Sequence, residues 1–147
     1  MENISKHISY YEATHSATAE RYDIDNTPNA TQLANMKIVA EVCFEPLRAW
    51  YGKPIRINSF LRVPELNVKV GGSKTSDHCN GKAIDFSAGS KEENKKLFDW
   101  CKANLKHDQL INEYDYQWVH ISFSVGINRN MTLAAIKVNG KTKYVSA

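Results

Sequence analysis

The longest hydrophobic pattern in the chain lies between Thr31 and Tyr51, where apolar residues recur at intervals of three and four positions. This spacing places them on one face of an α-helix and predicts the main core helix, with Thr31 as its N-terminal cap. Pro46 must bend or divide this helix, because proline lacks an amide hydrogen and clashes with the preceding turn. The apolar positions of this helix are Leu33, Met36, Val39, Ala40, Cys43, Phe44 and Leu47.

Three shorter helices are predicted around it. The first runs from residue 10 to about residue 22, where turn-forming residues end it. The second covers residues 64–70. The third opens at Ser90, which forms a capping-box pattern with Glu93, and continues to about residue 105.

Short β-branched and aromatic segments with alternating polarity predict six strands, the last two forming a hairpin around Asn139-Gly140. We therefore expect an α+β fold in which helices pack on a mainly antiparallel sheet, in a single domain over residues 1–147. The expected strands are residues 55–58, 83–86, 109–113, 118–123, 133–138 and 142–145.

Composition is that of a small globular protein, since 42% of the 147 residues are hydrophobic and 10% are aromatic. A net charge of +3 is too small to indicate nucleic-acid binding, although it favours approach to an anionic polymer. Cys43, Cys79 and Cys101 are odd in number and lack C-x-x-C spacing, so reduced thiols are expected rather than a disulfide framework or a cysteine zinc site. The N-terminus lacks a signal-peptide pattern and no apolar run would span a bilayer, so we expect cytoplasmic synthesis and no membrane insertion.

Two histidines and an aspartate offer ligands suited to one metal ion. His78 and Asp85 are separated by a short segment containing a glycine, so a strand after a tight turn brings Asp85 back beside His78. His120 would join them from a second strand. Three protein ligands with the fourth position left to water are typical of a catalytic zinc site. Such a water becomes a nucleophile near neutral pH, so the pattern indicates a zinc hydrolase.

The motif Ser76-x-His78-x-x-Gly81-x-Ala83-x-Asp85 resembles the signature of the zinc D-Ala-D-Ala peptidase family, whose fold is shared with the hedgehog signalling domain. Residues 57–67 and 71–75 resemble the segment before that signature in the short-chain phage and bacterial branch of the family. Further similarity runs from about residue 10 to about residue 125, including 108–113 and 118–122. The resemblance implies Zn2+ held by His78, Asp85 and His120. It also implies hydrolysis of peptidoglycan stem peptides near D-alanine, by a carboxypeptidase or an endopeptidase such as a phage endolysin.

The general base is where the chain departs from this family. Many members place a carboxylate three residues before the last histidine, but here that residue is Gln117, which cannot accept a proton. In the short-chain branch the acid can lie on the preceding strand, and Glu113 matches that element. Asp115 competes with it, because strand alternation would put both side chains on one face. We take Glu113 as the expected catalytic base.

Arg62 matches the family arginine that holds the substrate's terminal carboxylate, a role suited to bidentate guanidinium hydrogen bonds; the alternative is a surface salt bridge. Ser76 matches the signature serine, which binds substrate or merely caps its own turn. Trp118 is expected to pack in the core rather than to line the cleft. Cys79 is not expected as a fourth ligand, because its thiolate would fill the open position. The remaining histidines, His7, His15 and His107, have no matching motif and are assigned to surface or packing roles.

A second class of function fits the same residues, namely a non-catalytic binding module of the hedgehog type in which zinc only stabilises the fold. Gln117 favours that reading, whereas Glu113 and the ligand set favour a peptidase. For the peptidase we expect a monomer that binds a peptidoglycan peptide and no nucleic acid. It would reach the cell wall after release or export by another agent.

Overall fold

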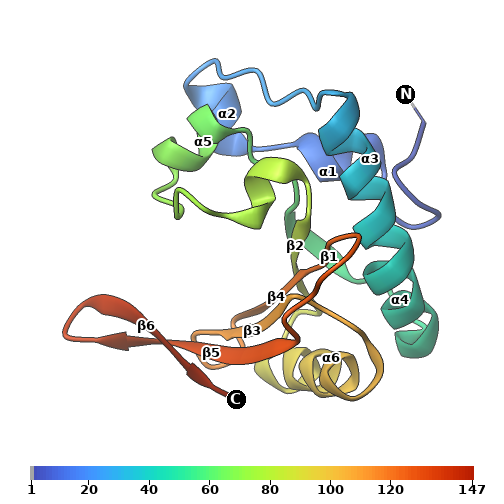
Figure 1. Cartoon of the computed structure of the whole chain (residues 1–147), viewed down its shortest axis with the longest axis vertical. Coiled ribbons are helices and arrows are strands. Elements are labelled where there is room, and N and C mark those ends of the chain that lie inside the picture. The colour runs from blue at the N-terminus through green and yellow to red at the C-terminus, as the bar shows by residue number, and fades with distance from the viewer. Residues whose placement is uncertain (1) are drawn as a thin grey trace.

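A six-stranded sheet organises the protein, whose computed structural model describes residues 2–147. The strand order is β1-β2-β4-β3-β5-β6, and every neighbouring pair is antiparallel except the parallel pair β3–β5. In Figure 1, α1, α2, α3 and α5 lie above this sheet, α4 lies to its side and α6 lies below it. The fold is therefore α+β with a mainly antiparallel sheet, as expected. The strands are β1 (Arg56–Ser59), β2 (Ala83–Ser87), β3 (Gln109–Glu113), β4 (Trp118–Ser122), β5 (Met131–Val138) and β6 (Lys141–Ser146).

The N-terminal region contains two helices where one was predicted, α1 (Tyr10–Thr14) and α2 (Ala17–Arg21). The prediction was wrong because Ser16 starts a new helix: its backbone is extended and its side chain accepts a hydrogen bond from the Ala19 amide. Ser9 caps α1 in the same way and forms a reciprocal capping box with Glu12.

The main helical segment consists of α3 (Ala30–Val39), the π-helical turn η1 (Ala40–Phe44) and α4 (Glu45–Tyr51). Pro46 lies in the first turn of α4, so the predicted division of the helix is confirmed. The predicted cap was wrong, because Asn29 rather than Thr31 starts α3, and its side chain and that of Gln32 exchange hydrogen bonds with each other's backbone amides.

The core lies between one face of the sheet and the helices α3, α4 and α6 (Lys91–Asn104). Side chains of a strand alternate between the two faces, so Ile84, Val119, Ile121 and Leu110 all project towards these helices. They meet Leu97, Phe98 and Cys101 of α6 and Met36, Val39 and Phe44 of the main helical segment. Full burial of each large side chain stabilises the fold by about 1.5–3 kcal/mol. This packing leaves the opposite face of the sheet free to carry the polar residues described below.

Ser90 starts α6 by accepting a hydrogen bond from the Glu93 amide, as predicted. The reciprocal half of the predicted capping box is absent among the described residues, because the Glu93 carboxylate instead accepts hydrogen bonds from Tyr51 and Lys53. No helix in the described part of the chain is both long and apolar enough to span a membrane.

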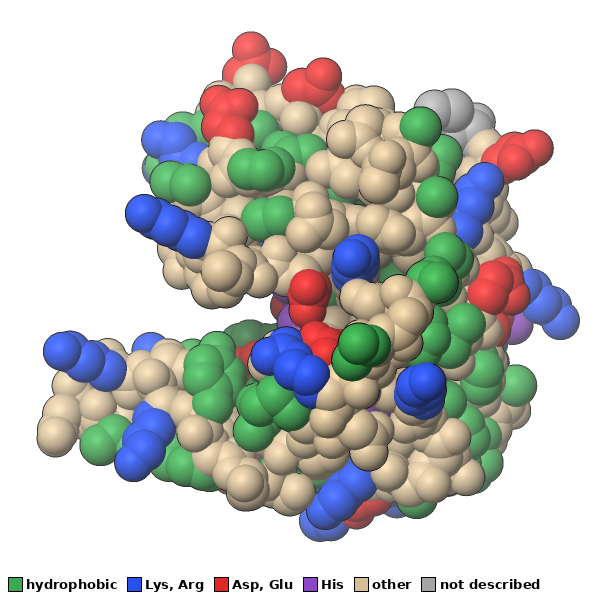
Figure 2. Space-filling view, in the orientation of Figure 1, with side chains coloured by type: hydrophobic (Ala, Val, Ile, Leu, Met, Phe, Trp, Pro, Cys, Tyr) green, Lys and Arg blue, Asp and Glu red, His purple; other side chains and the backbone are tan. Residues whose placement is uncertain are grey.

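The polar face of the sheet is overhung by α5 (Pro64–Lys69) and the 3-10 turn η2 (Asp77–Asn80). Gly81 ends η2 with a left-handed φ of 72° and lies directly on α3. A Cβ at this position would approach the Gln32 carbonyl oxygen and the Met36 side chain to 2.7 Å each. Only glycine therefore allows η2 to turn into β2 against α3. Figure 2 shows the resulting hollow between the helical part above and the β5–β6 hairpin below.

Candidate metal centre and cleft

His78, Asp85 and His120 come together from three elements at the bottom of this hollow. His78 belongs to η2, while Asp85 and His120 are direct partners in the antiparallel register of β2 and β4. One ligand atom from each residue lies within 4.8 Å of the other two. His78 and Asp85 are buried, and His120 is nearly so. Sequence analysis expected these three residues as one cluster, and the structure brings them together.

The hydrogen bonding of His78 leaves an unprotonated nitrogen facing the cluster. Its Nδ1 lies 2.7 Å from the carbonyl oxygen of Phe60, which can only accept, so Nδ1 carries the proton. In the neutral ring, Nε2 then presents a lone pair. It lies 3.1 Å from Asp85 Oδ1 but is buried with no hydrogen-bond partner among residues 2–147. Two lone pairs that face each other at this distance repel unless a cation lies between them.

Asp85 is held in its charged form in spite of its burial. In the metal-free protein burial opposes ionisation, but attraction to His78 and His120 in their protonated forms outweighs it and holds the pKa of Asp85 well below its ordinary value; a bound cation would attract the carboxylate in place of those protons. His120 Nδ1 lies 2.9 Å from Asp85 Oδ1. A carboxylate and two imidazole nitrogens are ligands that zinc prefers, and three of them match its catalytic form. The residues present thus fit a zinc ion.

The cleft around this cluster has a volume of about 730 Å³. Its floor is the polar face of the sheet, where alternation places Trp118 and His120 of β4 beside Ile111 and Glu113 of β3. Its upper edge is the segment of residues 70–78, which follows α5. A peptide in this cleft would therefore contact the metal cluster and Glu113 together.

Glu113 is the last residue of β3, and only 8% of its surface is exposed. Burial raises the pKa of Glu113 to about 7, and Asp85 adds to the rise while His120 and Arg62 oppose it. A carboxylate with a pKa near neutrality can both accept and return a proton at physiological pH.

Asp115 lies outside the cleft, so the expectation that it shares a face with Glu113 was wrong. The strand ends at Glu113, and Tyr114, Asp115 and Tyr116 all adopt left-handed φ angles of 52° to 63°. Asp115 is exposed and pairs with Lys91 of α6. Strand alternation does not continue through a left-handed turn, so Asp115 is directed to a different surface.

Side chains from other elements hold this turn. Asn94 of α6 is buried and donates from Nδ2 to the carbonyl oxygens of Tyr116 and Gln117, at 2.8 and 3.1 Å. Asn112 Oδ1 accepts from the Tyr116 amide at 2.6 Å. Gln117 lies in the turn beside a surface hollow that it shares with Asp115, rather than among the residues that line the main cleft. Gln117, which favoured the interpretation as a non-catalytic module, thus lies outside the cleft.

Arg62 and Ser76 lie side by side on the upper edge of the cleft. An Arg62 terminal nitrogen is 3.4 Å from Ser76 Oγ, and its buried Nε has no hydrogen-bond partner among the described residues. Arg62 forms no ion pair within residues 2–147, so the salt-bridge alternative is not observed there. Ser76 Oγ accepts from the His78 amide at 3.2 Å, so it caps η2. The guanidinium therefore remains available to an anion in the cleft.

Trp118 was expected in the core, but it is half-buried and lines the cleft, where its ring packs on that of Tyr114 with centroids 5.6 Å apart. The reason is its position on the polar face of β4, in register with Glu113. Cys79 is not part of the ligand cluster, and burial raises the pKa of its thiol. All three cysteines are free thiols, as expected.

The other histidines have the surface and packing roles that were expected for them. His7 pairs with Glu45, and His15 lies 3.4 Å from Glu20 at the surface. His107 is buried and its ring nitrogens lie within hydrogen-bonding distance of the Leu105 carbonyl and the Thr132 hydroxyl. None of the three lies in the cleft.

The C-terminal hairpin contributes to this site, which was not predicted from the sequence. Met131 and Leu133 of β5 and Thr142 and Tyr144 of β6 line the cleft. The alternation of these four positions was visible in the sequence. Their proximity to Glu113 was not, because it results from the parallel pairing of β3 and β5.

The family model described as Peptidase M15 matches residues 6–122. No curated protein shows significant similarity to the chain. The matched segment contains the three residues of the metal cluster, Glu113, Arg62 and Ser76, and ends before β5.

Proposed function

The chain belongs to the peptidase M15 family, and we propose that it is a zinc metallopeptidase that cleaves peptidoglycan stem peptides near D-alanine. Membership of this family makes the protein a metallopeptidase, in agreement with the His-Asp-His cluster. The observation that carries the proposal is the presence, in one cleft, of the unprotonated Nε2 of His78 and the near-neutral carboxyl of Glu113.

His78, Asp85 and His120 would hold the ion. Bound there, zinc would supply Lewis-acid chemistry, polarising the scissile carbonyl group and acidifying water. The Phe60 carbonyl oxygen fixes the His78 ring by accepting a hydrogen bond from Nδ1–H, so the nitrogen that faces the ion keeps its lone pair.

Glu113 is proposed as the proton carrier. It accepts a proton from the attacking water as the new carbon–oxygen bond forms, and it returns that proton to the amine nitrogen as the carbon–nitrogen bond breaks. Burial favours this exchange, because the pKa of about 7 lies near the operating pH. The products are a peptide carboxylate and a free amine.

Arg62 is proposed to bind the substrate's terminal carboxylate, with Ser76 beside it. Its buried Nε has no partner among residues 2–147, and a carboxylate would satisfy this donor. Carboxypeptidase action needs this contact, whereas an endopeptidase would accept a chain that continues past Arg62.

The decisive experiment is digestion of purified muropeptides by the zinc-loaded protein, with products read by mass spectrometry. A new D-alanine or a shortened stem peptide supports the proposal and identifies the bond. Glu113→Gln should abolish the products while Asp115→Asn, the matched control, should retain them. If wild type releases no product from any muropeptide, the substrate assignment falls, and the non-catalytic alternative becomes the better account of the cleft.

A further inference from the structure

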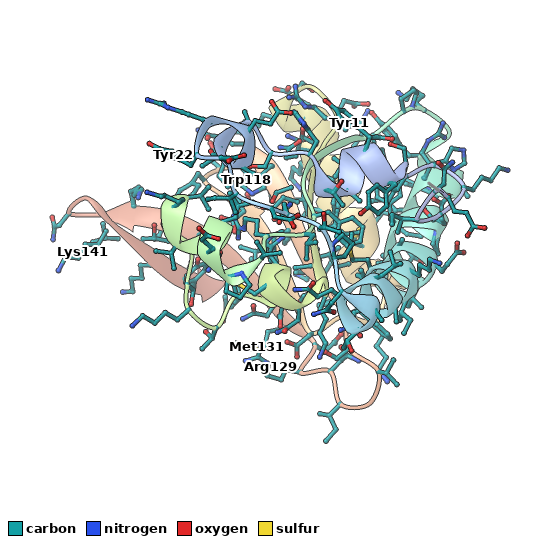
Figure 3. The ribbon with its side chains drawn as sticks, turned by 90° about the horizontal axis from the view of Figure 1, so that it is seen from above. Tyr11, Tyr22, Trp118, Arg129, Met131 and Lys141 are labelled. Atoms are coloured by element: carbon teal, nitrogen blue, oxygen red, sulfur yellow. The ribbon has the colours of Figure 1, made fainter. Side chains whose placement is uncertain are left out.

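The C-terminal hairpin extends the cleft beyond the segment that the family model matches. β5 and β6 cover Met131–Val138 and Lys141–Ser146, whereas the match ends at residue 122. The hairpin reaches outward from the body of the protein in Figure 1, and Figure 3 labels Lys141 at its tip, far from Met131 at its base. β6 is also the outermost strand of the sheet.

Strand register shows which hairpin side chains share the cleft face. Glu113 pairs with Trp118 on one side and with Ala135 on the other, and Ala135 pairs with Tyr144. These four residues form a row that crosses β4, β3, β5 and β6. Strands are spaced by roughly 4.8 Å, so Tyr144 stands about 10 Å from Glu113 across the strands, with only the methyl group of Ala135 between them. Ala135 is fully buried, and the row is bounded by the aromatic rings of Trp118 and Tyr144.

A cationic group lies next to this row. Lys137 pairs with Thr142 on the same face, its Nζ is 3.2 Å from Thr142 Oγ1, and it lies 5.4 Å from the centre of the Tyr114 ring. Tyr114 and Thr142 line the cleft and their hydroxyls are 2.6 Å apart. Lys137 has no carboxylate partner within residues 2–147. After Asp115 the sequence contains no acidic side chain, so the whole hairpin carries positive charge only.

We propose that the hairpin is a specificity element, in which Tyr144, Thr142 and Lys137 bind an acidic residue of an extended peptide substrate. This inference rests on the proposed peptidase function and adds to it the chemistry of the substrate beyond the scissile bond. Across the sheet, Arg62 comes from the segment after β1, and Asp85, His120 and Glu113 lie on the middle strands. Lys137 lies on β5, and His78 joins the metal cluster from η2. With the terminal carboxylate at Arg62, the substrate segment N-terminal to the cleaved bond extends past Leu133 and Thr142, which line the cleft, towards Tyr144.

Two physical features of the hairpin suit an acidic residue of a peptide substrate. Tyr144 is 54% exposed, so its ring face is open to contact with a peptide. Lys137 is fixed by Thr142 and the Tyr114 ring, so a carboxylate meets a cation whose position is already restricted. A neutral residue at the same substrate position would gain the ring contact and lose the charge contact.

The test compares synthetic peptides that share one scissile bond and differ by Glu or Gln at a position N-terminal to it. A truncated peptide keeps the scissile bond and lacks the residues from that Glu or Gln position onward towards the N-terminus. Wild type should cleave the Glu peptide with kcat/KM roughly 2–5-fold above the Gln peptide, the range expected for a partly exposed ion pair. Lys137→Glu should reverse that preference. Lys143→Glu is the matched control, because Lys143 pairs with Ile136 on the opposite face of the same hairpin and should leave the preference intact.

Tyr144→Ala should raise KM for the long peptides roughly 3–10-fold, a size typical of one aromatic contact, and leave the truncated peptide unaffected. Tyr144→Phe keeps the ring and should restore most of the affinity for the long peptides that Tyr144→Ala loses, which separates loss of the ring contact from misfolding of the hairpin. If Lys137→Glu and Lys143→Glu change the preference for the Glu peptide equally, and both still cleave the peptides, the hairpin inference is wrong while the proposed function stands.

A binding measurement tests the hairpin separately from hydrolysis, in case no peptide is cleaved. The Glu peptide should shift the backbone amide NMR signals of β5 and β6 in wild type and not in Lys137→Glu. If those shifts occur although no peptide is cleaved, the hairpin inference holds and the proposed hydrolysis fails. If the Glu peptide leaves the hairpin signals of wild type unchanged, the inference is wrong.

Discussion

Replacement of Glu113 by glutamine should inactivate the enzyme and, in the metal-free protein, stabilise the fold above neutral pH. Glutamine keeps the shape of the side chain and removes its charge. Burial raises the pKa of Glu113 from an ordinary value of 4.5 to about 7 in the folded protein. In the unfolded chain the carboxyl ionises near its ordinary value, so between these two pH values the folded state binds more protons than the unfolded state.

Because the folded state binds more protons, the free energy of unfolding of the wild type falls as the pH rises through this interval. Stability contributed by protonated Glu113 is fully present below pH 4.5 and is lost as the pH rises to about 7. At about 1.4 kcal/mol per pH unit, the interval corresponds to roughly 3 kcal/mol. Glu113→Gln does not incur this loss, so its stability advantage over wild type should be near zero at pH 4 and reach about 3 kcal/mol by pH 8. For a chain of this size that is a difference in Tm of about 6–12 °C.

Thermal unfolding of the chelator-treated proteins, followed by circular dichroism from pH 4 to pH 8, measures this effect. Asp115→Asn is the control, because Asp115 is exposed and paired with Lys91 at the surface. A constant difference in Tm between Glu113→Gln and wild type across this range would refute the argument that burial raises the pKa of the Glu113 carboxyl. In the zinc-loaded proteins, Glu113→Gln should lower kcat about 10²–10⁴-fold with zinc retained, whereas Asp115→Asn should change it little.

Three other predictions concern the metal, the substrate carboxylate and the turn after β3. Elemental analysis should find one zinc per wild-type chain and almost none in His78→Ala; free zinc at 100 times its Kd should add about 2.7 kcal/mol to wild-type stability alone. Arg62→Ala should cost about 2–4 kcal/mol in kcat/KM on free-acid peptides and much less on amidated ones; equal losses would assign Arg62 a structural role. Asn94→Ala should destabilise the fold by about 2–3 kcal/mol in denaturant titrations, because it leaves the Tyr116 and Gln117 carbonyls unpaired; a change below about 0.5 kcal/mol would contradict this.

The hydrophobic pattern by itself determined the helices and strands that build the core. Alternation along β2, β3 and β4 separates Ile84, Val119 and Ile121 from Asp85 and His120, so the sequence already implied one apolar and one polar face. The pair of His78 and Asp85 was equally accessible, because one short turn through Gly81 joins them. His120 is 35 residues from Asp85 on another strand, and the family motif rather than local spacing indicated it.

Tertiary structure decided the two features that the sequence left open or concealed. Glu113 and Asp115 have the same strand spacing, and the left-handed turn that separates them is held in part by Asn94 of α6, 22 residues away from Tyr116. The hairpin reaches the cleft through the parallel pairing of β5 with β3, which joins segments that other strands and loops separate. A segment's own pattern shows that it is a strand and which residues share a face. Its partner depends on the packing free energy of the whole sheet, which no local window of sequence contains.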